Sequence, residues 1–264
     1  MDGEHIRSLT ADPQTTGLFL DFDGTLSEIV HLPSDARPLE GAANILKQLA
    51  ARYGVVAVVS GRSAGQLLRW LGPEIEIWGT HGAQRVVDGN VVLSDHAAAY
   101  EELMRRVHDE AEREMAELAI PGAVLEDKGI MIGLHFRATE DQERARVALD
   151  RLAQQLADRH GLRRAGGRLA FELRPPADFT KAAVVLERSL ELDLSAAAFF
   201  GDDRVDLPAF DALDDLAERG IATVRVAVRS DEVPAELIER ADMVVDGPIG
   251  ALDVLQQLVD AGRS

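Results

Sequence analysis

The sequence of 264 residues contains no cysteine, which excludes disulfide bonds, thiolate nucleophiles and cysteine-ligated metal sites. It has no apolar run long enough to span a bilayer, and residues 1–17 lack the apolar core of a secretion signal. Basic residues are scarce, because 28 of them stand against 46 acidic residues and leave a formal net charge of −18. This balance disfavours binding to nucleic-acid backbones and to anionic membranes. We therefore expect a soluble, cytoplasmic protein without a nucleic-acid or membrane partner.

Lysine is the scarcest basic residue, since only Lys47, Lys128 and Lys181 are found among the 28 basic side chains. Arginine is a wide planar fork, whereas lysine is a compact point charge that suits a tight phosphate site. Each lysine is therefore a candidate for a site that needs such a charge. With 46% hydrophobic residues, the chain is long enough for one large domain or two modest ones.

Short apolar segments alternate with segments of helical periodicity at both ends of the chain. This alternation is typical of an α/β fold in which helices cover both faces of a parallel sheet. The strands that we expect in this sheet are 17–21, 55–59, 75–78, 196–200, 222–228 and 243–245.

The middle of the chain has a different pattern. It predicts one long helix over 95–118, two strands around the turn Asp127-Lys128-Gly129, a helix over 140–160 and a strand over 168–174. This order indicates a small α/β unit with an antiparallel sheet, inserted into the parallel domain. The expected boundaries are 1–94 and 178–264 for the main domain, and 95–177 for the inserted domain.

Polar clusters follow the expected parallel strands. Asp21-Phe22-Asp23-Gly24-Thr25 follows the first strand, Ser60-Gly61-Arg62 follows the second, and Gly201-Asp202-Asp203 follows the fourth, with Asp206 close behind. Lys181 lies at the start of the helix after the insertion. Ligands of open parallel sheets bind beyond the carboxyl ends of the strands, so these clusters are expected to converge at one edge.

The residue types in these clusters suit phosphoryl transfer. Neighbouring carboxylates such as Asp21 and Asp23 are unfavourable without a cation or a proton, and Mg²⁺ prefers such oxygen ligands. One carboxylate can attack phosphorus while another acts as general acid and base. Lys181, the Ser60 hydroxyl and the Gly61 amide would then stabilise the transferred group.

Each cluster taken alone has an ordinary structural explanation. An Asp-Gly pair is often a turn, a serine before a helix is often a cap, and a lysine on a helix is usually solvated. The argument for a catalytic site rests on their order and their shared position after the strands.

The sequence Asp21-Phe22-Asp23-Gly24-Thr25-Leu26 resembles the first signature of the haloacid-dehalogenase (HAD) phosphatases, and Ser60, Lys181 and Gly201-Asp202-Asp203 are similar to the next three. The resemblance implies a Rossmann-like core with an inserted cap domain. It implies Asp21 as nucleophile, Asp23 as acid and base, and Ser60 and Lys181 on the phosphoryl group. It also implies Mg²⁺ bound by Asp21, the Asp23 carbonyl and Asp202, with Asp203 or Asp206 supporting these ligands.

Further elements resemble the trehalose-6-phosphate phosphatase branch, namely Gly79-Thr80-His81-Gly82-Ala83, Glu172-Leu173-Arg174-Pro175 and Val244-Val245-Asp246-Gly247. This resemblance implies Mg²⁺-dependent hydrolysis of trehalose 6-phosphate through an aspartyl phosphate, a step of trehalose biosynthesis. A trehalose-6-phosphate synthase would be a metabolic neighbour only.

Recognition of a sugar phosphate requires donors and acceptors for its hydroxyl groups. On a strand, alternate residues share a face, which pairs His135 with Arg137 and Glu172 with Arg174. The substrate-binding residues that we expect are Gly61, Arg62, His81, Gly82, Lys128, His135, Arg137, Glu172 and Arg174.

The sequence departs from the trehalose branch where Val205 and Leu207 flank Asp206 and where Ala182 follows Lys181. These departures keep open a phosphatase for another sugar phosphate or for a trehalose-like pseudo-disaccharide phosphate. A sugar-phosphate mutase and a non-catalytic sugar-phosphate-binding protein on the same fold are further alternatives.

Overall fold

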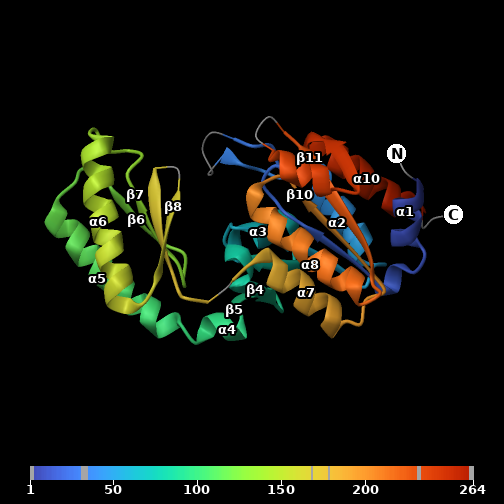
Figure 1. Cartoon of the computed structure of the whole chain (residues 1–264), viewed down its shortest axis with the longest axis horizontal. Helices are drawn as coiled ribbons and strands as arrows, with labels where there is room; N and C mark the ends of the chain where they lie inside the picture. The colour runs from blue at the N-terminus through green and yellow to red at the C-terminus, as the bar shows by residue number, and fades with distance from the viewer. Residues whose placement is uncertain (1–2, 31–34, 168, 178, 231–232, 262–264) are drawn as a thin grey trace. The chain divides into compact units, whose positions relative to one another are not determined.

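The computed structural model describes residues 3–30, 35–167, 169–177, 179–230 and 233–261 (Figure 1). Its internal contacts divide the chain into two compact units. The first unit comprises Met1–Val92 and Phe179–Ser264, and the second comprises Leu93–Asp178. Among the described helices, none combines the length and the apolar character that crossing a membrane requires.

The first unit contains an eight-stranded sheet in the order β12-β11-β10-β1-β2-β3-β4-β5. The six strands from β12 to β3 pair in parallel, and β4 runs antiparallel to β3. The predicted parallel α/β sheet is therefore confirmed. The strands are β1 (Thr16–Leu20), β2 (Val55–Val59), β3 (Glu76–Gly79), β4 (Gln84–Val87), β5 (Asn90–Leu93), β10 (Ala196–Gly201), β11 (Ala222–Arg229) and β12 (Met243–Asp246).

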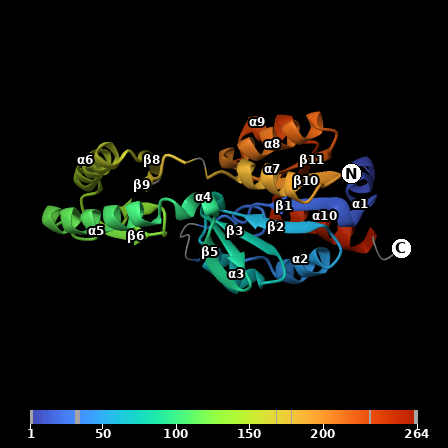
Figure 2. The same cartoon turned by 90° about the horizontal axis from the view of Figure 1, so that it is seen from below.

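Helices cover both faces of this sheet (Figure 2). Successive side chains of a strand point to opposite faces, so Leu18 and Leu20 of β1 pack in one apolar cluster and Phe19 packs in the other. The first cluster includes α1 (Gly3–Thr10), α2 (Ala42–Ala50), α3 (Ala64–Leu71) and α10 (Gly247–Ala261). The second includes α7 (Lys181–Glu191), α8 (Leu207–Glu218) and α9 (Ala235–Arg240). The structure also describes the short 3₁₀ helices η1 (Pro13–Thr15), η3 (Thr80–Gly82) and η4 (Arg204–Asp206).

The second unit is a four-stranded antiparallel sheet in the order β6-β7-β9-β8. Buried residues of its two long helices pack with alternate strand residues such as Leu134 and Leu173. The strand residues between these point to the other face and are polar or small. The elements are α4 (Asp95–Ala98), α5 (Glu101–Leu118), β6 (Val124–Asp127), β7 (Ile132–His135), α6 (Gln142–His160), β8 (Arg163–Gly167) and β9 (Ala170–Arg174).

Two features of the second unit differ from the sequence prediction. The single helix expected over 95–118 is broken, because Tyr100 takes φ −105° and ψ −4° and α5 restarts after it. Strand β8 was not expected, since Arg163-Arg164-Ala165-Gly166-Gly167 has no apolar alternation. The strand predicted over 168–174 is β9, and Arg168 lies outside the described residues.

Candidate active site

The carboxyl ends of β10, β1 and β2 are neighbours, because β1 lies between the other two strands in the sheet. Asp21 follows β1, and its N–H continues the pairing by donating to the Phe200 carbonyl at 2.9 Å. Ser60 follows β2 and donates its N–H to the Trp78 carbonyl at 3.0 Å. Asp202 follows β10. The sheet thus brings these three side chains to one edge.

Lys181 joins this edge as the first residue of α7, whose N-cap hydroxyl on Thr180 accepts the Ala183 N–H. The Lys181 Nζ lies 2.7 Å from Asp21 Oδ1 and 2.6 Å from Asp206 Oδ1. Burial disfavours the lysine charge, but the two carboxylates outweigh it and raise the pKa of Lys181 above its usual range. The lysine is therefore a fixed positive charge beside Asp21.

Asp206 is already fully engaged within the protein. Its Oδ1 accepts from Lys181, and its Oδ2 accepts the backbone N–H groups of Asp202 at 3.0 Å and Asp203 at 3.1 Å. Asp203 is exposed, and its own carboxylate accepts the Arg204 N–H at the start of η4. Asp206 therefore organises the loop that carries Asp202.

The carboxylates at this edge of the sheet form a group that fits a divalent cation. Ligand atoms of Asp21, Asp202 and Asp206 all lie within 4.8 Å of one another. Burial raises the pKa of Asp21 to about 7 and that of Asp202 to about 8, with further contributions from the neighbouring carboxylates. The buried Oδ1 of Asp202 has no hydrogen-bond partner among the described residues. A cation that takes oxygen ligands would offset the repulsion between these carboxylates and would give Asp202 Oδ1 a partner.

Gly24 allows this close packing of loops. It has φ +75°, a backbone conformation that favours glycine, and a Cβ at this position would overlap the Asp202 carboxylate. The glycine of the Asp-Gly pair is therefore needed for the approach of the two strand-end loops, and not only for a turn.

A cavity of about 390 Å³ opens at this edge. Most of the predicted site residues of the first unit line it, and so do two apolar side chains that were not predicted as site residues, Ile29 and Val205. The predicted residues in the lining are Asp21, Asp23, Ser60, Gly61, His81, Lys181, Asp202 and Asp203.

Asp23 and Arg62 form a two-fold ion pair. Arg62 Nε lies 2.7 Å from Asp23 Oδ2, and Arg62 Nη2 lies 2.7 Å from Asp23 Oδ1. The Arg62 side chain is only 10% exposed, whereas that of Asp23 is 41% exposed. Ser60 and Gly61 of the same loop line the cavity, whereas Arg62 is not among the described lining residues.

His81 contacts the Ser60-Gly61 loop. Thr80, His81 and Gly82 all have positive φ, which is a strained conformation for the first two. The His81 N–H donates to the Ser60 carbonyl at 2.9 Å, and a Cβ on Gly61 would lie 2.9 Å from the His81 ring. Gly82 is buried, and a Cβ there would lie 2.7 Å from Val184 Cγ2, so the turn packs closely against α7.

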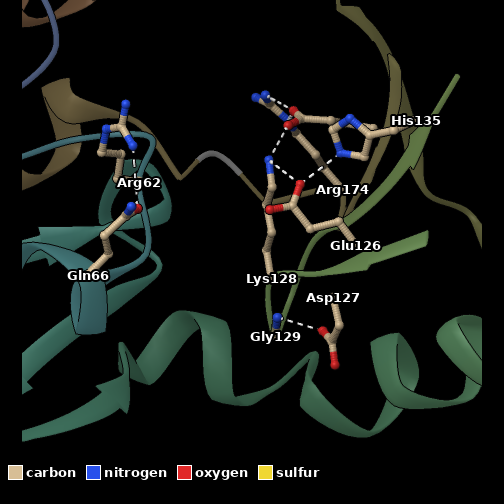
Figure 3. Close-up of polar contacts among 9 residues, drawn as sticks. Arg62, Gln66, Glu126, Asp127, Lys128, Gly129, His135 and Arg174 are labelled. Atoms are coloured by element: carbon tan, nitrogen blue, oxygen red, sulfur yellow. Dashed lines mark hydrogen bonds and ion pairs between the residues drawn. The ribbon is translucent and has the colours of Figure 1, made fainter. Parts of the chain in front are cut away.

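Four of the five predicted polar residues of the second unit, Lys128, His135, Glu172 and Arg174, belong to an ion-pair cluster on one face of its sheet (Figure 3). Lys128 Nζ lies 2.9 Å from Glu172 Oε1, and Arg174 Nε lies 3.1 Å from Glu172 Oε2. His135 Nε2 lies 2.7 Å from Glu126 Oε2. Although burial opposes it, Lys128 and Arg174 lower the pKa of Glu172 to about 2.

Gly133 occupies the centre of this cluster. Glu126, Gly133 and Glu172 pair across three strands, so the two carboxylates flank a position without a side chain. Glu126 is not among the residues predicted from the sequence, although its position two residues before Lys128 places both on one face of a strand. Arg137 lies beyond the end of β7, and the contact that the structure gives it is its carbonyl accepting from Gln142.

Residues 19–239 match the sequence model of the trehalose-phosphatase family. A trehalose-phosphate phosphatase of Mycolicibacterium paratuberculosis is 34% identical over 253 residues, which cover 92% of this chain and 62% of the relative. That of Mycobacterium tuberculosis is 36% identical over 204 residues, which cover 74% of this chain and 51% of the relative. The chain therefore spans less than two thirds of the length of these relatives.

Solved structures share the fold. A trehalose-6-phosphate phosphatase related protein has a TM-score of 0.73 and 23% identity, covering 93% of this chain and 98% of its own. The trehalose-6-phosphate phosphatase of Aspergillus fumigatus has a TM-score of 0.64 and 21% identity, covering 99% of this chain and 98% of its own. A haloacid dehalogenase-like hydrolase of Bacteroides thetaiotaomicron has a TM-score of 0.59 and 14% identity, covering 92% and 99%. These matches confirm the predicted HAD-type fold with an inserted unit.

Proposed function

This chain belongs to the trehalose-phosphatase family, and from that premise we propose that it hydrolyses trehalose 6-phosphate to trehalose and inorganic phosphate. The observation that carries the proposal is the cavity that brings Asp21, Ser60 and Lys181 together at the carboxyl edge of the sheet. We assign catalysis to the first unit and sugar recognition to the second.

In the first half of the reaction, the Asp21 carboxylate attacks phosphorus. A bond forms between Asp21 and phosphorus, and the bond between phosphorus and the sugar oxygen breaks. Asp23 donates a proton to the departing oxygen, which lowers the barrier for a poor leaving group. Lys181 neutralises charge beside the nucleophile, and the Ser60 hydroxyl donates to the phosphoryl group.

In the second half, a water molecule attacks the phosphorus of the aspartyl phosphate. Asp23 takes the proton of this water, the bond between Asp21 and phosphorus breaks, and inorganic phosphate leaves. Asp21 returns to its carboxylate form and Asp23 to its protonated form, so both residues are ready for another turnover.

The metal of this proposal is Mg²⁺. Asp21, Asp202 and the Asp23 carbonyl would bind it, while Asp206 keeps the Asp202 loop in place. When bound, the ion supplies positive charge for the buried carboxylates and for the phosphoryl oxygens. Its removal would leave Asp21 with a raised pKa and therefore less of the nucleophilic carboxylate at neutral pH.

Sugar recognition is proposed for the cluster around Gly133. The side chains of Glu126, Lys128 and Glu172 offer acceptors and a donor around Gly133, beside the His135 ring, which would lie 2.7 Å from a Cβ at that position. A sugar hydroxyl can replace one contact of such an ion pair without leaving a charged group unsatisfied. Sites of this kind reject analogues that lack the hydroxyl.

The test is release of inorganic phosphate from trehalose 6-phosphate and a panel of other sugar phosphates, with Mg²⁺ and with a chelator. Asp21→Asn keeps the shape of the nucleophile but removes its charge, and is expected to abolish release. Asp88→Asn makes the same change at the exposed turn between β4 and β5 and should leave release unchanged.

The outcomes separate the alternatives. Release of phosphate from trehalose 6-phosphate supports both the proposed substrate and the proposed reaction. Release only from another sugar phosphate supports the reaction but identifies a different substrate. Isomeric sugar phosphates without free phosphate would identify a mutase. Binding of sugar phosphates without turnover would identify a sensor and contradict the proposed reaction.

A further inference from the structure

Arg62 is fixed from several sides in the first unit. Its guanidinium carbon lies 5.6 Å from the centre of the Phe22 ring and 5.3 Å from that of Trp70, and these two rings stack on each other at 5.1 Å. Its Nη1 donates to Gln66 Oε1 at 3.4 Å (Figure 3). Its backbone N–H donates to Ser60 Oγ at 3.2 Å, and its carbonyl accepts the Thr80 N–H at 2.8 Å.

This anchored guanidinium engages both oxygens of Asp23. Two parallel N–H donors fix the plane of a carboxylate as well as its position, which a single donor does not. Asp23 lines the cavity and is 41% exposed, so without these bonds its side chain would be free to rotate toward solvent. Arg62 is not among the described residues that line the cavity.

We propose that Arg62 is a positioning residue that holds the Asp23 carboxylate for proton transfer to the departing sugar oxygen. This inference rests on the proposed function. It assigns Arg62 a role through Asp23, in place of the contact with substrate that its position in Ser60-Gly61-Arg62 first indicated. The proton moves from the Asp23 carboxyl group to the sugar oxygen as the bond between phosphorus and that oxygen breaks. The ion pair with Arg62 stabilises the carboxylate that this leaves on Asp23, and Arg62 itself neither gains nor loses a proton.

Two substrates distinguish this role from phosphate binding. A sugar hydroxyl is a poor leaving group and depends on the general acid, whereas p-nitrophenolate departs from p-nitrophenyl phosphate without a proton. The constant kcat/KM includes only the steps up to departure of the leaving group, so it does not include the later activation of water by Asp23. Both substrates present the same phosphoryl group to the cavity.

The test compares kcat/KM for the two substrates in the wild type, Arg62→Lys and Asp23→Asn. Arg62→Lys keeps the charge but replaces two parallel donors by one point charge. We expect it to lower kcat/KM for trehalose 6-phosphate by about tenfold or more, since general acids contribute on the order of 10²–10⁴-fold. We expect a change of about twofold or less for p-nitrophenyl phosphate, and the same selectivity in Asp23→Asn.

Arg37→Lys is the matched control, because the Arg37 guanidinium also lies over Trp70, at 5.6 Å, whereas the two-fold ion pair with Asp23 is made by Arg62. It should change neither constant. If Arg62→Lys does not fold, Trp70→Leu removes the ring beneath the guanidinium and is expected to shift the ratio of the two constants in the same direction. Equal losses for both substrates would overturn the role of Arg62, whereas a wild type inactive on trehalose 6-phosphate would overturn the proposed function.

Discussion

Lys181 Nζ lies 2.6 Å from Asp206 Oδ1, and the side chains are 2% and 0% exposed. The same carboxylate accepts two backbone N–H groups of the loop that carries Asp202. One side chain therefore positions both the lysine beside Asp21 and the loop with a proposed metal ligand. Asp206 is therefore buried for a structural reason, because protein donors already occupy both of its carboxylate oxygens.

Loss of this carboxylate should destabilise the protein strongly. Asp206→Ala leaves a buried lysine with one partner fewer, and leaves the buried N–H of Asp202 and the part-buried N–H of Asp203 without this acceptor. Removal of one member of a buried ion pair costs about 3–5 kcal/mol. Asp203→Ala removes only an exposed cap and should cost about 1 kcal/mol or less. Urea unfolding of both variants measures the difference, and equal losses would contradict the organising role of Asp206.

Gly24→Ala should inactivate the enzyme. Its added methyl would overlap the Asp202 carboxylate and displace it, and a displacement of about 1 Å at a catalytic group can cost on the order of a hundredfold in rate. Gly89→Ala is a close control, because Gly89 has nearly the same φ, +74° against +75°, but open space around its Cβ position. Phosphate release is measured for both variants. A loss only in Gly24→Ala identifies the overlap with Asp202 as the cause, whereas equal losses would point to the strain of positive φ.

Mg²⁺ should stabilise the folded protein and this effect should depend on Asp202. A ligand at one hundred times its Kd stabilises the native state by about 2.7 kcal/mol, which raises the melting temperature. In Asp202→Asn the rise should be lost, because a neutral amide replaces the buried carboxylate whose unsatisfied oxygen faces the proposed ion. Thermal unfolding with and without Mg²⁺ is the measurement, and an unchanged Mg²⁺ effect in this variant would place the ion elsewhere.

The ion pairs of Glu172 predict a pH dependence of stability. Its folded pKa of about 2 lies below its ordinary value of 4.5, so the stabilisation is complete above about pH 4.5 and is lost as the pH falls toward 2. The difference in unfolding free energy between the wild type and Glu172→Gln should therefore narrow from pH 5 to pH 3. Glu143→Gln, at an exposed helix pair with Arg146, is the control and should differ less from the wild type at each pH.

Substitution of the three lysines should affect the two substrates differently. Lys128→Ala is expected to raise the KM for trehalose 6-phosphate by roughly tenfold, because it removes about one hydrogen bond to a charged group. The KM for p-nitrophenyl phosphate, which has no sugar, should stay nearly unchanged. Lys47→Ala is the control, since Lys47 is 59% exposed and pairs with Glu74 at the surface. Lys181→Ala should impair both substrates. Equal KM values for wild type and Lys128→Ala would contradict sugar recognition by this face.

Much of the fold was predictable because its signals are local. Apolar runs at 55–59 and 196–200 and helical periodicity at 207–218 correspond to β2, β10 and α8. Strand β8 and the break at Tyr100 were not predictable, since the first has no apolar alternation and the second leaves no mark in the sequence. The hairpin of β4 and β5 was missed as well, because it lacks a buried face.

The sequence by itself determined the alternation of strands and helices, the position of polar clusters after the strands, and the chemical types available there. Tertiary structure alone decided which group pairs with which. Packing between distant segments decides that Asp206 binds Lys181 and two backbone N–H groups, and that Arg62 engages both oxygens of Asp23. Local periodicity reports which face of a segment is buried, but the partner of each charged group depends on desolvation and contacts that exist only after the sheet has assembled.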